Sequence, residues 1–360
     1  MSAVARSLLW QPPPERVAIF RALNLGDLLC AVPALRALRK ALPRATMTLI
    51  GLDSARPVVE RFSDYLDDFL LFPGDPAFPE QEPRPSELPA FYRCARARHF
   101  DLALQMHGSG SRSNAIVRAL GARQWAGFVP SPRQQEPGRL MAWRDAEPEI
   151  HRYLRLLDYL GLTPDGQDLE FPLARRDIDQ AARLASEAGI NGRRTVVIHP
   201  GARLASRRWP VERFASVANR LIEDGWQVVI TGSGDETDLV AGLERACSSH
   251  VVNLCGRTTL GSLAALLRNV RLLVCNDTGV SHVAAAVGAR SVIIACGSDA
   301  ARWAPLDTSR HRVLHASMAC RPCMYQECPI GHPCAYAIGV DEVVAQARRQ
   351  LAYGGSDHGA

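Results

Sequence analysis

The chain has 360 residues, which is enough for about two domains. Apolar residues make up 47% and charged residues 22% of it, a globular composition that excludes disordered, collagen-like and fibrous proteins. The formal charge is +5, from 42 basic and 37 acidic residues without a dense basic block, so we expect no nucleic-acid partner. No apolar run of about 18 residues could span a bilayer and no secretion signal is visible, so we expect a cytoplasmic protein.

The first half of the chain alternates strand and helix patterns. Short β-rich apolar runs predict strands at residues 17–20, 47–50 and 102–106. The first run breaks at residues 24–27 (NLGD), and apolar residues then recur at helical spacing over 28–42. This strand-turn-helix-strand order is typical of a parallel sheet.

The sequence predicts that three stretches are loops or linkers rather than helices or strands of the core. Residues 73–89 and 129–149 are rich in proline and have little apolar periodicity, so we expect surface loops or mobile lids there. Residues 164–176 are polar and contain proline, which favours an interdomain linker.

The second half repeats the α/β rhythm. The patterns predict strands at 195–199, 227–231, 251–254, 272–275 and 291–295, and helices at 211–223, 238–246, 259–268 and 280–287. We therefore predict an α/β protein of two Rossmann-like, doubly wound parallel-sheet domains that face a cleft. The expected N-terminal domain covers residues 1–170 and the C-terminal domain 171–345, and residues 346–360 form a helix end and a flexible tail.

The segment 276–282 (NDTGVSH) carries the strongest chemical signal. It follows an apolar strand and opens an alanine-rich helix, where unpaired backbone N–H groups favour an anion. Thr278 and Gly279 are therefore well placed to hold a phosphate. The alternative is an ordinary Asp/Thr helix cap with a packed His282.

Two further strand ends could contact a nucleotide. The stretch 199–203 (HPGAR) leaves a strand through a glycine turn and continues to Arg207 and Arg208, which would suit a diphosphate. At 232–236 (GSGDE), a carboxylate could accept hydrogen bonds from ribose hydroxyls. The alternatives are a solvated basic loop and a plain glycine-rich turn.

In the first half, Asp27 follows the first strand and could act as a general base on an acceptor hydroxyl, or else cap a helix. Arg112 follows another strand and could meet acceptor carboxylates or phosphates, or else be a plain surface arginine. Neither GxGxxG at the first turn nor GxxxxGK[ST] occurs, which argues against a dinucleotide dehydrogenase and a P-loop NTPase.

Four late cysteines, Cys320, Cys323, Cys328 and Cys334, form a Cys-rich segment over residues 320–334. Four thiolates at this spacing could hold a structural zinc ion or an Fe–S cluster, and reduced thiols or disulfides are the alternatives. Because the segment follows the last predicted strand, we expect it to lie away from the phosphate loops and to have no catalytic role.

Taken in order, these motifs resemble glycosyltransferase family 9, the ADP-heptose:lipopolysaccharide heptosyltransferases, over residues 16–351. The resemblance rests on the segments 25–27 (LGD), 33–38 (PALRAL), 199–202 (HPGA), 208–210 (RWP), 232–236 (GSGDE) and 277–282 (DTGVSH). It implies a GT-B fold with an N-terminal acceptor domain and a C-terminal nucleotide-sugar domain. It also implies inverting, metal-independent transfer of a heptose from an ADP-activated donor to the lipopolysaccharide inner core.

The resemblance also assigns roles to single residues. Asp27 matches the catalytic base, and Glu236 and Asp277 match carboxylates that contact the ribose and the donor sugar. The other expected donor contacts are Arg203, Arg207, Thr278, Gly279 and His282, and Arg112 is the expected acceptor contact. No cofactor is expected for catalysis, and the lipid-linked acceptor implies peripheral contact with the cytoplasmic face of the inner membrane. The alternatives are another nucleotide-sugar enzyme, such as a 2-epimerase, and an inactive sugar-nucleotide-binding protein.

Overall fold

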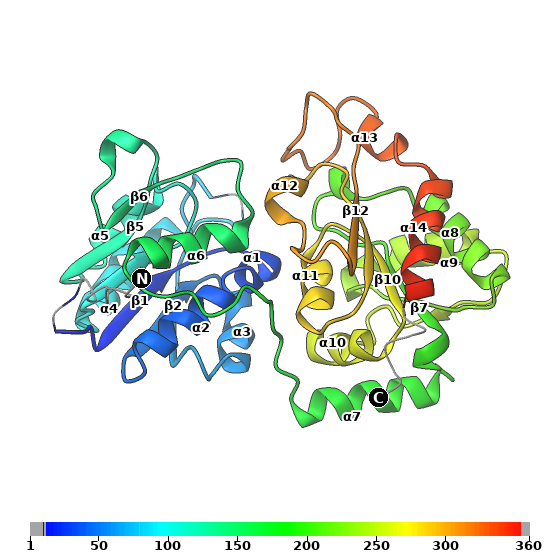
Figure 1. Ribbon diagram of the computed structural model, residues 1–360, viewed down its shortest axis with the longest axis horizontal. Helices are drawn as coiled ribbons and strands as arrows, with labels where there is room; N and C mark the ends of the chain where they lie inside the picture. The colour runs from blue at the N-terminus through cyan, green and yellow to red at the C-terminus, as the bar shows by residue number, and fades with distance from the viewer. Residues whose placement is uncertain (1–9, 11, 79, 354–360) are drawn as a thin grey trace, which may run out of the picture. The chain divides into compact units, whose positions relative to one another are not determined.

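The computed structural model describes residues 10, 12–78 and 80–353. The chain divides into two compact units, Met1–Asp168 and Leu169–Ala360 (Figure 1). Each unit contains one six-stranded sheet with all of its strands parallel. The predicted α/β class with two doubly wound parallel sheets is therefore confirmed.

The N-terminal sheet has the strand order β3-β2-β1-β4-β5-β6. Its strands are β1 (Arg16–Phe20), β2 (Thr46–Gly51), β3 (Asp68–Leu71), β4 (Leu102–Gln105), β5 (Gln124–Val129) and β6 (Leu140–Ala142). Its helices are α1 (Leu25–Leu29), α2 (Val32–Ala41), α3 (Arg56–Arg61), α4 (Leu88–Ala97), α5 (Ser113–Ala119) and α6 (Glu149–Tyr159). The central strands β1 and β4 are almost completely buried, as expected for a parallel sheet covered on both faces.

Two predictions in this unit need correction. The single helix expected over 28–42 is two helices, α1 and α2, with Pro33 in the first turn of α2, where its missing N–H costs no hydrogen bond. The expected loop over 129–149 contains the strand β6, which pairs with β5 at the edge of the sheet. Three residues are too few for a periodic pattern to reveal a strand.

The C-terminal sheet has the corresponding order β12-β11-β10-β7-β8-β9. Its strands are β7 (Thr195–His199), β8 (Gln227–Ile230), β9 (Val252–Asn253), β10 (Leu272–Asn276), β11 (Ser291–Ile294) and β12 (His311–Leu314). Its helices are α7 (Arg175–Glu187), α8 (Val211–Glu223), α9 (Thr237–Ala246), α10 (Leu260–Asn269), α11 (Gly279–Ala286), α12 (Ala300–Trp303), α13 (Pro333–Tyr336) and α14 (Val340–Tyr353).

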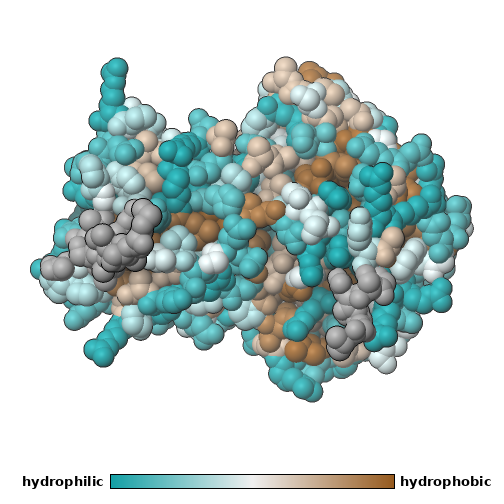
Figure 2. All heavy atoms as spheres, viewed as in Figure 1, coloured by the Kyte–Doolittle hydropathy of each residue, from teal (hydrophilic) through white to brown (hydrophobic). Residues whose placement is uncertain are grey.

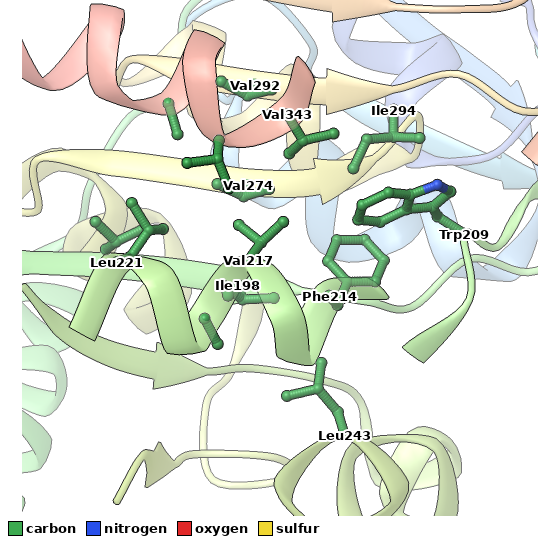
Figure 3. Packing of buried hydrophobic residues seen from close by; sticks show 14 of the residues in the cluster. Ile198, Trp209, Phe214, Val217, Leu221, Leu243, Val274, Val292, Ile294 and Val343 are labelled. Atoms are coloured by element: carbon green, nitrogen blue, oxygen red, sulfur yellow. The ribbon is translucent and has the colours of Figure 1, made fainter. Parts of the chain in front are cut away.

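One hydrophobic core cluster of the C-terminal unit lies between the sheet and the helices α8, α9 and α14. Phe214 and Val217 of α8 face Ile198 and Val274 of the central strands, and the Trp209 ring closes one end of the cluster (Figure 3). This packing fixes the strand ends to which the loops of the candidate site are attached.

In both sheets the strand order reverses between the first strand and its neighbour, at β1/β4 and at β7/β10. Ligands of open α/β sheets bind outside the carboxyl ends of the strands at such a switch point. Asp27 follows β1, and the two predicted phosphate-binding stretches follow β7 and β10. The topology therefore brings the chemically interesting loops to the ligand-binding position of each sheet.

None of the described helices is both long and apolar enough to cross a membrane. The face drawn in Figure 2 is mostly hydrophilic, with apolar residues gathered in smaller patches. Among the large apolar side chains that are exposed, Met324, Tyr325, Ile330 and Tyr336 fall in the Cys-rich segment or just after it.

Candidate functional site

Asp27, the predicted base, lies in the short helix α1 of the N-terminal unit. The cap residue of this helix is Asn24, so Asp27 does not cap it. The Asp27 side chain is half-buried. A carboxylate with this degree of exposure can accept a proton from a bound hydroxyl group.

A buried guanidinium holds the backbone of Asp27. Arg21, directly after β1, is 1% exposed, and its Nε donates a hydrogen bond to the Asp27 carbonyl oxygen at 3.0 Å. Its Nη2 donates to the same oxygen, and its Nη1 donates to the Met106 carbonyl oxygen at 2.7 Å. Since Met106 follows β4, one side chain joins the two strand ends of the switch point. Sequence reasoning misses Arg21, although an arginine directly after an apolar strand is a visible signal.

Side chains of α6 complete this buried charged cluster. Tyr153 Oη accepts a hydrogen bond from Arg21 and donates one to Glu149 Oε1 at 2.6 Å, and Arg152 pairs with the other Glu149 oxygen. Burial lowers the pKa of Arg21, but Tyr153 and Glu149 raise it above its ordinary value. The nearby Asp27 carboxylate raises this pKa further, so the Arg21 guanidinium stays charged.

Arg112, the predicted acceptor contact, lies at the start of α5 after β4. Its Nε donates to both carboxylate oxygens of Asp75, at 3.0 and 3.1 Å, and this partner raises the pKa of Arg112. Asp75 is buried, whereas the Arg112 side chain is 58% exposed. The ion pair therefore fixes one edge of the guanidinium, and an anion in solution can still reach the rest.

In the C-terminal unit, Asn276 joins the loops that follow β7 and β10. Its buried Nδ2 donates to the Pro200 carbonyl oxygen at 2.6 Å, and its Oδ1 accepts from the Trp209 N–H at 2.9 Å. Trp209 is itself locked by a hydrogen bond from its Nε1 to the Ala335 carbonyl oxygen at 3.1 Å. Residues 201–208, which we call the donor loop, are therefore fixed at both ends. Sequence reasoning misses this role of Asn276, although the residue opens the strongest motif.

Glu236 lies against the donor loop. Its Oε2 accepts a hydrogen bond from the Ser233 N–H at 2.8 Å and lies 3.9 Å from His199 Nε2. A Cβ atom on Gly201 would lie 1.9 Å from Glu236 Oε1, so the close approach of loop and carboxylate requires glycine. Burial lowers the pKa of His199 while Glu236 opposes the shift. The structure thus brings the predicted ribose contact to the donor loop.

The arginines of the donor loop differ in their surroundings. Arg203 is exposed, and Arg208 Nε donates to the Ala202 carbonyl oxygen at 2.8 Å. Arg207 Nη2 contacts Met324 Sδ at 3.3 Å, and its buried Nε has no hydrogen-bond partner among the residues that the structure describes. Because an unpaired buried donor is unfavourable, this N–H is suited to a ligand oxygen.

The predicted phosphate motif opens α11. Thr278 is the cap residue and Gly279 the first helical residue, and the Thr278 side chain does not cap the helix. Asp277 is only 7% exposed. His282 is buried and packs edge-on against the Trp303 ring, with 6.5 Å between the ring centroids.

In the part of the chain that the structure describes, the four late cysteines are not arranged as a ready metal-binding group. Cys334 belongs to the hydrophobic core, Cys320 is exposed, and all four are free thiols. Burial raises the pKa of the Cys334 thiol. Nowhere in residues 10, 12–78 and 80–353 are three His, Cys, Asp or Glu side chains placed to hold a metal ion.

From its place in the sequence, the Cys-rich segment is expected to lie away from the phosphate loops. The structure shows that it contacts one of them, the donor loop. The Ser206 N–H of the donor loop donates to the Gln326 carbonyl oxygen at 3.1 Å. That prediction is wrong because the chain returns from β12 to the carboxyl end of the sheet before α13 begins.

A model of the family described as glycosyltransferase family 9 (heptosyltransferase) matches residues 90–333. The lipopolysaccharide heptosyltransferase 2 of Escherichia coli (strain K12) is 24% identical over 305 residues, which cover 81% of this chain and 85% of that protein. Three other curated heptosyltransferases, two from Campylobacter jejuni and one from Salmonella typhimurium, are matched over about half (52%) of their own length.

Solved structures of other proteins share the fold of this chain. A glycosyl transferase family 9 protein from Veillonella parvula DSM 2008 superposes with a TM-score of 0.75 at 20% identity, covering 94% of this chain and 97% of that chain. The E. coli heptosyltransferase WaaC with ADP-2-deoxy-2-fluoro heptose gives a TM-score of 0.66 at 15% identity, covering 93% and 99%. At these identities the likeness shows the fold, and the predicted GT-B fold is confirmed.

Proposed function

Because the chain belongs to glycosyltransferase family 9, the heptosyltransferases, we propose that it moves a heptose from an ADP-activated donor to the inner core of lipopolysaccharide. The acceptor binds to the N-terminal domain, residues 1–170, and the donor to the C-terminal domain, residues 171–345. The reaction inverts the anomeric centre and needs no metal ion. Support for ADP comes from the similar E. coli heptosyltransferase WaaC, whose solved structure is described with ADP-2-deoxy-2-fluoro heptose.

The observation that carries the proposal is the bridge that Asn276 forms at the switch point of the C-terminal sheet. It holds the donor loop beside the start of α11. There, Arg203 and Arg207 supply positive charge and the helix start supplies N–H groups. In the proposed site Thr278 and Gly279 contact the phosphates, and the remaining donor contacts are Glu236 to the ribose, Asp277 to the sugar, and His282.

In the proposed reaction Asp27 removes the proton from an acceptor hydroxyl. The oxygen attacks the anomeric carbon from the side opposite the diphosphate, so a new C–O bond forms as the bond to the leaving ADP breaks. Negative charge grows on the departing diphosphate, and fixed positive groups such as Arg207 stabilise it. One base and one cationic leaving-group site are sufficient for a single inverting displacement.

The acceptor is an anionic glycolipid, and we assign its docking to Arg112, whose exposed guanidinium can pair with a carboxylate or phosphate. A lipid-linked acceptor also requires the enzyme to contact the cytoplasmic face of the inner membrane peripherally. Sedimentation with vesicles that contain the acceptor tests this contact, and recovery of all the protein in the supernatant would contradict it.

The decisive experiment replaces Asp27. Loss of a general base lowers the rate by about 100-fold or more. We therefore expect Asp27→Ala and Asp27→Asn to abolish transfer while the affinity for ADP, measured by isothermal titration calorimetry, stays within a few-fold. Asp53→Ala is the matched control, because Asp53 is an exposed carboxylate after β2 of the same sheet. Equal loss of transfer and of ADP binding would remove Asp27 from its proposed role.

The Asp27 variants also distinguish a heptosyltransferase from the alternative functions. A 2-epimerase or an inactive binding protein would bind a sugar nucleotide without an Asp27-dependent transfer. Titration with ADP, UDP and GDP tests the base of the donor, and preference for UDP or GDP would contradict the heptose donor. Activity that survives a chelator and a product of inverted anomeric configuration, seen by NMR, would support the proposed mechanism.

A further inference from the structure

The Cys-rich segment has no part in the function proposed above, yet it packs on the donor loop. The segment, residues 320–334, has little regular secondary structure before α13 begins at Pro333 (Figure 1). It exposes large apolar side chains such as Met324 and Ile330. Little of its own surface is therefore buried in a core. Hydrogen bonds to neighbouring loops must contribute much of its order.

Ser206 connects the donor loop to the Cys-rich segment. It lies in the middle of the donor loop and is 1% exposed. Its N–H donates to the Gln326 carbonyl oxygen at 3.1 Å, its Oγ donates to the Tyr325 carbonyl oxygen, and its carbonyl oxygen lies 2.7 Å from His332 Nε2. Each of its three polar groups is thus bonded to the Cys-rich segment.

The contacts extend to both sides of Ser206. Met324 Sδ lies against Arg207, the arginine assigned to the diphosphate. On the other side, the Cys323 N–H donates to the Gly297 carbonyl oxygen at 2.9 Å. A Cβ atom on Gly297 would lie 2.8 Å from Cys323 Sγ and 3.2 Å from the Ser206 carbonyl oxygen, so these three chain segments meet with no spare room.

The conformation of His332 also fits a positioning role. Its φ angle is 60°, in the left-handed region that few non-glycine residues adopt. Its N–H donates to Cys328 Sγ at 3.2 Å, and its ring reaches Ser206 from this conformation. Uncommon backbone conformations of this kind persist where the surrounding contacts hold them, often at functional sites.

We propose that the Cys-rich segment is part of the donor site, where His332 and Ser206 are positioning residues that hold Arg207 against the diphosphate of the nucleotide-sugar donor. This inference rests on the proposed function, because it takes Arg207 as a diphosphate contact. In this arrangement the segment contacts no substrate and acts through the donor loop.

The test compares ligands with and without phosphates. We expect His332→Ala to weaken ADP binding by about tenfold, the effect of losing one buried hydrogen bond, and to leave the affinity for adenosine unchanged. His332→Gln, whose amide can donate to the same oxygen, should restore most of the ADP affinity. His315→Ala, which removes an exposed histidine just before the segment, is the matched control.

A double mutant shows whether the effect passes through Arg207. His332→Ala added to Arg207→Ala should cause no further loss of ADP affinity, because coupled residues are not additive. The KM for the donor should rise while the KM for the acceptor does not. Ser206→Ala deletes one oxygen and should give a loss of about threefold, which provides the same test if His332→Ala does not fold.

Two results would overturn the inference. One is unchanged ADP affinity in both His332→Ala and Ser206→Ala, and the other is an equal loss for ADP and adenosine, which would indicate general disruption. These results differ from a failure of the proposed function, in which Arg207→Ala itself would bind ADP as tightly as the unmodified protein.

Discussion

Two segments carry the proposed chemistry, and they are held in place by different physical means. The first, which we call the Asp27 loop, is the connection between β1 and α2 that contains the short helix α1. It is held by Arg21, a charged side chain buried inside the N-terminal unit. The donor loop is held by neutral groups, which are the Asn276 amide and the three polar groups of Ser206. Removing one partner of a buried charge costs far more than removing a neutral hydrogen bond. Damage to the first loop should therefore appear as loss of stability, and damage to the second as loss of affinity.

The largest effect should come from Arg21→Met. The substitution removes the hydrogen bonds that Arg21 donates to the Asp27 and Met106 carbonyl oxygens, and it takes a cation from the buried Glu149 carboxylate. We expect the free energy of unfolding to fall by about 3 to 5 kcal/mol, measured by urea denaturation.

Arg123→Met is the control for this substitution, because Arg123 is 79% exposed and its pairing with Asp101 should contribute little. A loss below about 1 kcal/mol in Arg21→Met would show that the cluster is no more important than a surface ion pair. The contrast between the two loops would then disappear.

A smaller loss of stability is expected when the pH is lowered, and its source lies in the C-terminal unit. His311 of β12 is buried beside Ser291, and this burial lowers its pKa to about 4. The unfolded chain protonates this histidine near pH 6.5, so between pH 6.5 and 4 only the unfolded state gains the proton. Stability should be full above pH 7 and fall by about 3 kcal/mol as the pH drops to 4.

The measurement is the free energy of unfolding at pH 7, 6 and 5 for the unmodified protein and for His311→Gln. The variant should show a shallower loss between pH 7 and 5, because it lacks the titrating group. His199 is also buried with a lowered pKa and contributes in the same direction. Parallel pH curves for the two proteins would exclude His311 as a source of acid sensitivity.

The smallest effect tests the donor loop alone. In Gly201→Ala the new methyl group overlaps the Glu236 carboxylate, which must rotate away from its position. We expect ADP affinity to fall by about tenfold, roughly the contribution of one charge-assisted hydrogen bond, with little change in the urea midpoint.

Gly234→Ala is the matched glycine control, because nothing lies within 4 Å of a Cβ atom at that position. If Glu236 is the cause, Gly201→Ala should have no further effect in a Glu236→Ala background. Loss of stability in Gly201→Ala as large as in Arg21→Met would contradict the proposed difference between the two loops.

Much of the architecture was predictable from local patterns. The expected helix over 211–223 coincides with α8, and the expected strand over 195–199 coincides with β7. Short edge strands such as β6 were not predictable, because three residues carry no period. The break between α1 and α2 could not be predicted, because the apolar residues of the two helices follow a single helical spacing.

The sequence by itself determined the parallel α/β class, the family, and the strand ends at which Asp27, the donor loop and the 276–282 motif occur. These features depend on periodicity and on short motifs, which are local properties of the chain. Only the tertiary structure decided that Arg21 is buried beneath Asp27 and that His332 meets Ser206, although 126 positions separate that pair. The reason is physical: contacts between distant residues depend on strand order and on the paths of the loops, and no local pattern encodes either of them.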